Sequence, residues 1–311
     1  MRFKKPIFWD IKKPNILCYF LYPLSLLTLI RNKFKINSIK KYNNIKTICV
    51  GNIYVGGTGK TPLTIELNNI LKKLNYKTAF IKKYYKDQLD EQKMLSLNGK
   101  LFCEKKRITS INKALADNTD IAIFDDGLQD NTLKYDIAIV CFNLQNWIGN
   151  GMLIPAGPLR ETLESLIKYD AVFLNGNGEK SENIKTIIKK YNLNLKIFEA
   201  NYVLINSNNL DSNSNYFVFS GIGNPKTFKR TLENNKFNII KFLEFPDHYN
   251  YTDNDIIKIK TEAQKLNAKI LTTEKDFMRL NKSNAENINF FKIKLNIDNE
   301  NELINFLKSK L

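Results

Sequence analysis

The stretch VGNIYVGGTGKTP, from Val50 to Pro62, joins a short apolar run to an expected helix through several glycines and a Gly-Lys-Thr triplet. A strand over 47–50 would deliver the backbone, and glycines would let the chain wrap closely around an anion because they lack a Cβ. A helix beginning at Thr61 would add its free N–H groups and the positive end of its dipole. Lys60 would then contact the outer phosphates of a nucleoside triphosphate, and the Thr61 hydroxyl a magnesium ion. The stretch therefore predicts a phosphate-binding loop.

This loop departs at one position from the P-loop pattern G-x-x-x-x-G-K-[ST]. Gly59, Lys60 and Thr61 are in register, whereas the first glycine would fall at Tyr54. A plain glycine-rich turn is the alternative, but the apolar strand before it and the apolar spacing of the helix after it provide the context that a nucleotide site requires. We therefore expect consecutive residues to surround the phosphates: Tyr54, Val55, Gly56, Gly57, Thr58, Gly59, Lys60 and Thr61.

Two acids follow a second apolar run, in DIAIFDDGLQD. The run from Ile121 to Phe124 predicts a strand, and Asp125 and Asp126 stand at its end. A carboxylate at the end of a strand parallel to the P-loop strand is the usual Walker-B arrangement, in which it holds magnesium directly or through water. An Asp-Gly turn between strands is the alternative. The P-loop earlier in the chain favours the metal interpretation.

A loop rich in glycine and proline, GNGMLIPAGPLRE, ends in Arg160 and Glu161 at the expected start of a helix. Arg160 could hold a phosphate with its guanidinium fork, or it could pair with a surface carboxylate. The residues alone leave both interpretations open.

The composition limits the class of protein. The chain has 311 residues, which is enough for two α/β domains. Its formal net charge of +17 invites a nucleic-acid interpretation, but the lysines are scattered and no nucleic-acid motif accompanies them, so we expect no nucleic-acid partner. The charge would instead attract acidic lipid, nucleotide or phosphorylated substrate, and no obligate protein partner is evident. Four cysteines without a C-x-x-C pair, and a single histidine, argue against zinc and indicate free thiols in a reducing compartment.

An apolar run near the N-terminus, NILCYFLYPLSLLTLI, is followed by basic residues: Arg31, Lys33 and Lys35. The run is shorter than the roughly 20 residues that span a bilayer, Pro23 interrupts it, and no signal-peptide cleavage site follows. A helix buried in the core is one interpretation. We prefer an interfacial helix on an anionic membrane surface, with three aromatic residues at headgroup level: Trp9, Tyr19 and Tyr22.

The remaining pattern predicts an α/β protein: a P-loop NTPase-like parallel-sheet domain, a second, smaller α/β domain and the N-terminal membrane-associated helix. We expect these parts at 1–35 for the helix, 36–168 for the P-loop domain and 169–311 for the second domain, with the last helix able to pack back on the first domain. After a strand at 77–81, the segment that begins with Asp90 and Glu91 is expected to be a loop. Further strands are expected at 137–141, 171–174, 194–199, 216–220, 239–242, 269–272 and 289–294, and helices near 181–191, 225–234, 253–266 and 299–309.

Several motifs, in this order and at these intervals, resemble the tetraacyldisaccharide 4′-kinase family of lipid A biosynthesis: VGNIYVGGTGKTP, DDGLQ, GNGMLIPAGPLRE, SGIGNP, FPDHY and TEKD. The resemblance covers nearly the whole chain, and this family also lacks the glycine at the position of Tyr54. It implies an enzyme that uses ATP and Mg²⁺ to phosphorylate the 4′-hydroxyl of a tetraacylated glucosamine disaccharide 1-phosphate, giving lipid IVA. It also implies a location at the cytoplasmic face of the bacterial inner membrane.

The resemblance assigns roles that the residues alone do not. Asp90 matches the acid of the family's GDEP segment and would be the general base, with His248 as its partner, although a lone histidine is more often structural. Arg160 and Glu161 match the pair near the phosphates and the metal. Three further positions would contact the lipid disaccharide: Tyr84, Lys82 and Glu91.

Three motifs depart from the family's pattern on or near the acceptor side. SRGYGR reads IKKYYK, so Lys82 replaces an arginine and cannot reproduce its bidentate fork. GDEP reads LDEQ, and DDGLQH reads DDGLQD with Asp130 in place of the histidine. Acceptor contacts are therefore expected to differ more than the nucleotide site.

Phosphoryl transfer mainly requires positioning and charge stabilisation, which Lys60, a magnesium ion on Thr61 with the two aspartates, and Arg160 would supply. By the expected boundaries Asp90 and His248 lie in different domains, so we hypothesise that the site spans the cleft between them and that closure brings the histidine to the aspartate. The alternative function is a P-loop ATPase or nucleotide switch that acts on a protein partner at the membrane.

Overall fold

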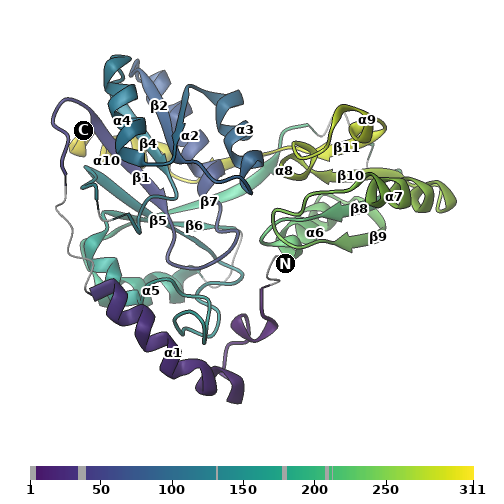
Figure 1. Ribbon diagram of the computed structural model, residues 1–311, viewed down its shortest axis with the longest axis horizontal. Coiled ribbons are helices and arrows are strands. Elements are labelled where there is room, and N and C mark those ends of the chain that lie inside the picture. The colour runs from purple at the N-terminus through teal and green to yellow at the C-terminus, as the bar shows by residue number, and fades with distance from the viewer. Residues whose placement is uncertain (1–4, 34–39, 131, 177–180, 207–209, 212) are drawn as a thin grey trace. The chain divides into compact units, whose positions relative to one another are not determined.

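The computed structural model describes residues 5–33, 40–130, 132–176, 181–206, 210–211 and 213–311 (Figure 1). They form two compact units. The first, which we call the P-loop unit, comprises Lys5–Tyr84, Asn98–Asn201 and Leu295–Leu311. The second, which we call the Asp90 unit, includes Tyr85–Leu97 and Tyr202–Lys294.

The P-loop unit is built on an eight-stranded sheet with the strand order β12-β7-β6-β5-β1-β4-β2-β3. The pairs from β7 to β3 are all parallel. The strands are β1 (Lys46–Gly51), β2 (Thr78–Lys83), β3 (Leu101–Glu104), β4 (Ile121–Asp125), β5 (Ile137–Asn143), β6 (Ala171–Asn175), β7 (Lys196–Leu204) and β12 (Ile293–Ile297). The last three residues of β7 and the first two of β12 fall in the Asp90 unit. Because the central strands are covered on both faces, they are buried along nearly their whole length, as their continuous apolar runs predict.

Helices cover this sheet. Helix α2 (Lys60–Lys73) packs on β1, β2 and β4, and α4 (Arg107–Ala116) packs on β2 and β3 (Figure 1). The unit also contains α1 (Ile16–Lys33), α5 (Ser181–Tyr191), α10 (Glu300–Lys310) and the short 3₁₀ helices η1 (Ile7–Trp9) and η2 (Leu163–Lys168). The C-terminal α10 is attached by a Phe306–Phe198 ring contact and by an ion pair between Lys310 and Asp170.

The Asp90 unit has a four-stranded parallel sheet in the order β11-β10-β8-β9. Its strands are β8 (Asn215–Ser220), β9 (Asn238–Glu244), β10 (Lys269–Thr273) and β11 (Ile288–Phe291). Its helices are α3 (Leu89–Asn98, the last residue of which falls in the P-loop unit), α6 (Pro225–Asn234), α7 (Asp253–Lys265), α8 (Glu274–Phe277) and α9 (Lys282–Ala285). Two apolar clusters, one around Val218 and one around Phe219, form the core of this unit.

The predicted α/β class with a parallel-sheet core is confirmed, but the chain divides elsewhere than at 168/169. Residues 171–201 and 295–311 belong to the P-loop unit. The reason is that β6 pairs in parallel with β5, with Ala171 opposite Ile139, and so extends the first sheet instead of starting another. A hydrophobic pattern identifies a strand but not the sheet that the strand joins.

The segment after residue 88 also differs from the expectation. It was predicted to be a loop, but it forms α3, with Asp90 buried in the first turn. Asp90 and His248 therefore belong to the same unit, and no closure of two units is needed to bring them together. The expected strands and helices also omitted β3 and α4, which together follow α3.

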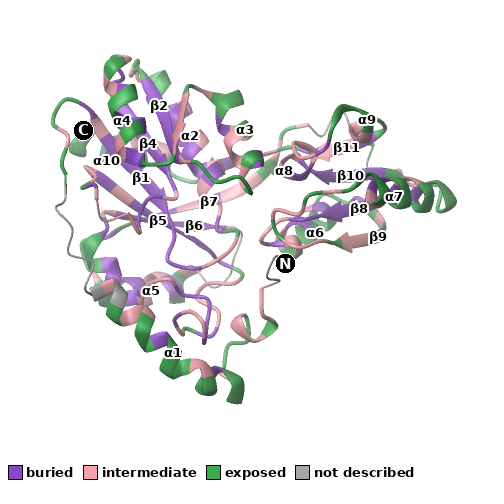
Figure 2. Cartoon of the chain, in the orientation of Figure 1, coloured by how far each residue is buried: buried purple, intermediate pink, exposed green. Residues whose placement is uncertain are grey.

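Helix α1 turns its small polar side chains inward. Ser25 donates to the carbonyl of Leu153 at 2.8 Å, and Thr28 to the carbonyl of Ile154 at 2.8 Å. Large apolar residues face outward, among them Ile16 at 88% exposure and Phe20 at 81%, and Figure 2 shows exposed residues along much of the helix. Lys35 lies outside the described residues, as do the side chains of Arg31 and Lys33.

Candidate active site

The phosphate-binding loop connects β1 to α2 and is held by buried amides. Gly59 caps the helix with a φ of 86°, a left-handed conformation that favours glycine. Asn52 donates to the Thr58 hydroxyl at 3.0 Å, and Asn175, at the end of β6, donates to the Thr58 carbonyl at 2.5 Å. These bonds hold the loop from the ends of β1 and β6, which lie on either side of β5 in the sheet, so its shape is set before any nucleotide binds.

Thr61 and Asp125 meet as the P-loop and Walker-B interpretations predict. The Thr61 hydroxyl lies 3.2 Å from Asp125 Oδ2. Asp125 is 1% exposed, and its Oδ1 is buried without a hydrogen-bond partner among the described residues. An unpartnered buried carboxylate oxygen beside a hydroxyl suits a hard divalent cation, which takes oxygen ligands. The donor set therefore fits Mg²⁺.

Lys82 also lies at this carboxylate. Its Nζ donates to Asp125 Oδ2 at 2.7 Å, and the lysine is 1% exposed. The resemblance placed Lys82 among the substrate contacts, but the structure buries it on β2, against the Walker-B acid. In a parallel sheet the ends of β2 and β4 lie side by side, which brings the two side chains together.

The second acid lies at the centre of a polar cluster. Asp126 Oδ1 accepts from Arg160 Nη1 at 3.0 Å and is 3.8 Å from Lys60 Nζ. Gln129 accepts from Arg160 at 3.1 Å and donates to Glu161 Oε1 at 2.9 Å. The structure thus brings together four predicted residues, Lys60, Asp126, Arg160 and Glu161. Gln129 was missed, although its motif DDGLQ was noted.

The turn that presents Asp126 is unusual. Its backbone is left-handed, with a φ of 58°, a conformation that is uncommon outside glycine and that aspartate adopts more often than most residues. Arg107 on α4 donates to the Asp126 carbonyl at 2.5 Å and to Asp130 at 3.0 Å. Asp130, where the related motif has a histidine, therefore helps to hold the arginine that braces this turn.

Two of the expected phosphate ligands have other partners. The N–H of Val55 donates to the carbonyl of Pro158 at 2.8 Å, so it is not directed at a phosphate. The Tyr54 side chain is buried, and its hydroxyl lies 2.6 Å from Asp10. Burial, and then Asp10, raise the pKa of Tyr54 far above its ordinary value. Tyr54 therefore joins the loop to the N-terminal segment.

The Asp90 unit contains the second cluster. His248 Nδ1 lies 3.2 Å from Asp90 Oδ1, and Arg279 donates to Asp90 Oδ2 through Nε at 3.0 Å and through Nη2 at 2.5 Å. Burial alone would raise the pKa of Asp90, but the hydrogen bond with His248 and the charges of Lys275 and Arg279 lower it well below its ordinary value. Asp90 therefore stays ionised at neutral pH.

Other residues of this unit were expected near the acceptor. Glu91, next to Asp90, forms an ion pair with Lys275 at 2.7 Å. Sequence reasoning missed Arg279 and assigned no role to Lys275, although the TEKD motif contains Lys275. In the P-loop unit, Tyr84 is exposed at the end of β2.

Comparison with known proteins decides the family. The family model described as tetraacyldisaccharide-1-P 4′-kinase matches residues 17–311. The chain belongs to this family. It is 52% identical over 309 residues to a tetraacyldisaccharide 4′-kinase of Pelagibacter ubique, covering 99% of this chain and 98% of the relative. It is 38% identical to the enzyme of the same name from Rickettsia bellii, covering 96% of each chain.

A solved structure supports the fold of this tetraacyldisaccharide-1-P 4′-kinase family member. It is that of LpxK from Aquifex aeolicus in complex with ATP, which aligns with a TM-score of 0.71 and covers 95% of this chain and 99% of that one. At 24% identity the likeness concerns the fold alone. The recognition made from the motifs is confirmed, and the protein is a kinase.

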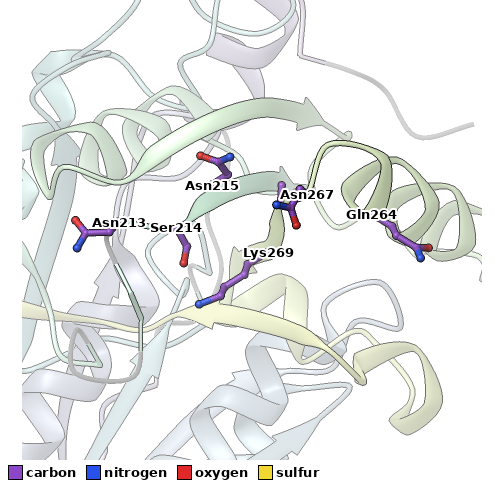
Figure 3. Close-up of a pocket in the computed structure, with 7 residues that line it drawn as sticks. Asn213, Ser214, Asn215, Gln264, Asn267 and Lys269 are labelled. Atoms are coloured by element: carbon purple, nitrogen blue, oxygen red, sulfur yellow. The ribbon is translucent and has the colours of Figure 1, made fainter.

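A cavity of about 480 Å³ lies elsewhere in the Asp90 unit (Figure 3). It is lined mainly by amide side chains, including Asn213, Asn215 and Asn267, with Lys269 as its one charged residue. No residue predicted to take part in catalysis or binding lines it. Among the described residues, no group of three or more His, Cys, Asp or Glu side chains is gathered for a metal, so a magnesium ion here would take its other oxygen ligands from phosphate or water.

Proposed function

We propose that the protein transfers the γ-phosphate of ATP to the 4′-hydroxyl of a tetraacyldisaccharide 1-phosphate, giving lipid IVA. The observation that carries this proposal is the phosphate loop that ends at Thr61, whose hydroxyl lies beside Asp125 of β4, in a chain that belongs to the 4′-kinase family. The relatives' names supply the acceptor, and the loop supplies the donor site.

Magnesium is part of the proposal. Thr61 and Asp125 would hold the ion together with phosphate oxygens. Asp126 and Glu161 would also contribute to the metal site. When bound, the ion would neutralise charge on the β- and γ-phosphates. Asp126 is already shared by Lys60 and Arg160, which suits a residue that keeps two cations near the transferred group.

The chain's own residues would perform the rest of the transfer. Lys60 and the N-terminus of α2 would bind the outer phosphates, and Arg160 would stabilise charge developing on the transferred group. The acceptor oxygen would attack phosphorus as ADP leaves, and the hydroxyl proton would pass to the Asp90–His248 pair. Tyr84 and Glu91 would contact the disaccharide.

The test is direct. Purified protein is incubated with γ-labelled ATP, Mg²⁺ and the tetraacyl disaccharide 1-phosphate, and labelled lipid is separated from ATP and phosphate. We expect labelled lipid that depends on acceptor. Release of labelled phosphate without acceptor, and no labelled lipid, would contradict the proposal and favour an ATPase or nucleotide switch.

We also propose that α1 holds the enzyme on the cytoplasmic face of the bacterial inner membrane. Within the described residues no helix is long and apolar enough to cross a bilayer. The supporting observation is the outward apolar face of α1, which includes Ile16, Phe20 and Leu27, while Ser25 and Thr28 face inward. Such a face suits the boundary between headgroups and acyl chains. Tyr19 and Tyr22 are exposed, whereas Trp9 donates to the carbonyl of Pro155 at 2.9 Å.

Outward substitutions test this attachment without changing the inward bonds. Phe20→Ser with Leu27→Ser should reduce sedimentation with anionic vesicles. The matched control is Ile257→Ser with Leu193→Ser, which replaces two exposed apolar residues elsewhere in the chain. Equal sedimentation of the two double variants would contradict an α1-mediated attachment.

A further inference from the structure

Tyr54 occupies the position at which the P-loop pattern has its first glycine, and the proposed transfer gives its side chain no role. The residue is 1% exposed, and its ring lies in an apolar cluster with Leu153 and Leu159. These two leucines belong to the loop that carries Arg160. The ring therefore packs the start of the phosphate loop against the loop of this arginine.

The main chain joins the same two loops. Tyr54 forms an antiparallel bridge with Leu159. The N–H of Arg160 donates to the carbonyl of Ile53 at 2.7 Å. The Arg160 side chain in turn donates to Asp126 Oδ1 at 3.0 Å. A displacement of Tyr54 would therefore move the start of the phosphate loop and the backbone of Arg160 together.

The Tyr54 hydroxyl attaches this pair of loops to the N-terminal segment. It donates to Asp10 Oδ1 at 2.6 Å, and a bond to a carboxylate is charge-assisted. Lys5 Nζ pairs with the same oxygen at 2.6 Å, donates to the hydroxyl and lies 4.4 Å from the centroid of the tyrosine ring. The hydroxyl is thus a donor to one side chain of the segment and an acceptor from another.

The N-terminal segment is itself held in place. Trp9 precedes Asp10 and donates through Nε1 to the carbonyl of Pro155 at 2.9 Å. Its own carbonyl accepts from the N–H of Asn150 at 2.9 Å. This carbonyl lies so close to Gly149, which has a φ of 60°, that a Cβ there would be 2.2 Å from the oxygen. Asp10 therefore has a fixed position from which it can hold the tyrosine.

We propose that Tyr54 is a positioning residue of the nucleotide site. Its bond to Asp10 keeps the start of the phosphate loop, and with it the backbone of Arg160, in the arrangement that binds ATP. A glycine at this position would have no side chain to make such a bond, and it is the more flexible residue. The inference rests on the proposed kinase reaction, in which this loop binds ATP.

The experiment removes the hydroxyl of the full-length protein and keeps the ring. In Tyr54→Phe, the dissociation constant of ATP, measured by calorimetric titration with Mg²⁺ present, should rise about threefold to tenfold, as expected for the loss of one hydrogen bond. The KM for ATP should rise by the same factor, and the KM for the lipid acceptor should not change. The matched control is Tyr42→Phe, which removes a hydroxyl that bonds to Asn112 at 3.0 Å in the same unit.

A double-mutant cycle assigns the effect to the bond between Tyr54 and Asp10. Asp10→Ala should raise the dissociation constant of ATP by a similar factor, and the double variant should be little worse than either single one, because both lose the same bond. Asp10→Asn keeps an acceptor oxygen and should recover part of the affinity. Effects that simply multiply in the double variant would show that the two residues act separately, and would overturn the proposed coupling.

The remaining outcomes separate this inference from the kinase proposal. An unchanged affinity for ATP in a folded Tyr54→Phe protein, or an equal loss in Tyr42→Phe, overturns the positioning role. If Tyr54→Phe does not fold, Asp10→Ala and Asp10→Asn give the same measurement from the other side of the bond. Failure of the wild type to label lipid would contradict the proposed function, but it would leave the comparison of ATP affinities intact.

Discussion

Asp125 and Asp90 are both buried carboxylates beside a basic side chain, yet their surroundings differ. Asp125 has Lys82 and Thr61 on one oxygen, and its other oxygen has no partner among the described residues. Asp90 has contacts on both oxygens, from Arg279 and from His248. A carboxylate that is to receive a metal must keep an oxygen available, whereas one that orients an imidazole must be held on both sides. The difference suits the roles proposed for them, a metal ligand at Asp125 and one half of a hydrogen-bonded pair at Asp90.

The two clusters share one backbone feature. Asp126, next to Asp125, has a φ of 58°, and His248 has a φ of 56°. Left-handed conformations of residues other than glycine carry strain and are maintained only where the surroundings enforce them. In each cluster an arginine contacts the nearby backbone: Arg107 contacts the Asp126 carbonyl, and Arg279 contacts the Gly221 carbonyl, which also accepts from the His248 N–H.

The largest effect on kcat is expected from substitutions in the Asp90–His248 pair. Asp90→Asn and His248→Ala would each break the hydrogen-bonded pair that is proposed to take the proton of the acceptor hydroxyl, so each should lower kcat by roughly 10²–10⁴-fold. The measurement is lipid phosphorylation at saturating ATP, with exposed Asp87→Asn as the control. Rates near wild type in both variants would eliminate the pair as catalytic machinery.

A slightly smaller effect is expected at the phosphate loop. Lys60→Met should lower kcat by roughly 10²–10³-fold, because a fixed cation no longer stabilises the transferred charge. Lys72→Met, an exposed lysine on the same helix, is the matched control. If Lys60→Met lost only ATP affinity and kept kcat, the lysine would bind ground and transition states equally, and its proposed role would need revision.

Replacing Lys82, the cation beside Asp125, tests how Asp125 differs from Asp90. Lys82→Met leaves an uncompensated buried carboxylate and should lower the free energy of unfolding by about 3 kcal/mol. Because Mg²⁺ would then meet no competing ammonium, its stabilising effect in thermal unfolding should be larger than in wild type. Lys82→Arg should behave like wild type, and Lys83→Met serves as the neighbouring control. Equal Mg²⁺ responses in Lys82→Met and wild type would show that Lys82 does not compete with the ion.

The smallest expected effect concerns acid stability. The lowered pKa of Asp90 means that its ionised form stabilises the fold above about pH 4, and that this contribution is lost as pH falls through the folded-state value. Between about pH 5 and 2, Asp90→Asn should therefore lose stability less steeply than wild type, by about 2 kcal/mol over the range. Denaturant unfolding at several pH values measures this, and parallel curves would mean that Asp90 contributes nothing to the acid transition.

Local signals revealed much of the site, and long-range pairing explains what they missed. The glycines, Lys60 and Thr61 are close in sequence, and the two acids stand at the end of the apolar strand β4, so spacing alone was enough to predict them. Lys82 was misplaced because only the parallel register of β2 and β4 brings it to Asp125. Arg279 was missed because it is separated from Asp90 by most of the chain, and α3 was taken for a loop because its ten residues show little helical amphipathicity.

Helix α1 contributes to more than membrane attachment, so its removal would also change the P-loop unit. Its inward side chains bond to main-chain carbonyls of the loop that carries Arg160, including Asn32 to the carbonyl of Arg160 itself at 2.8 Å. Deleting the helix would leave those acceptors exposed or unpaired and would loosen the segment that presents the arginine. A truncated, more soluble protein is therefore not simply the same catalyst without its attachment, because the helix also forms one wall of the P-loop unit.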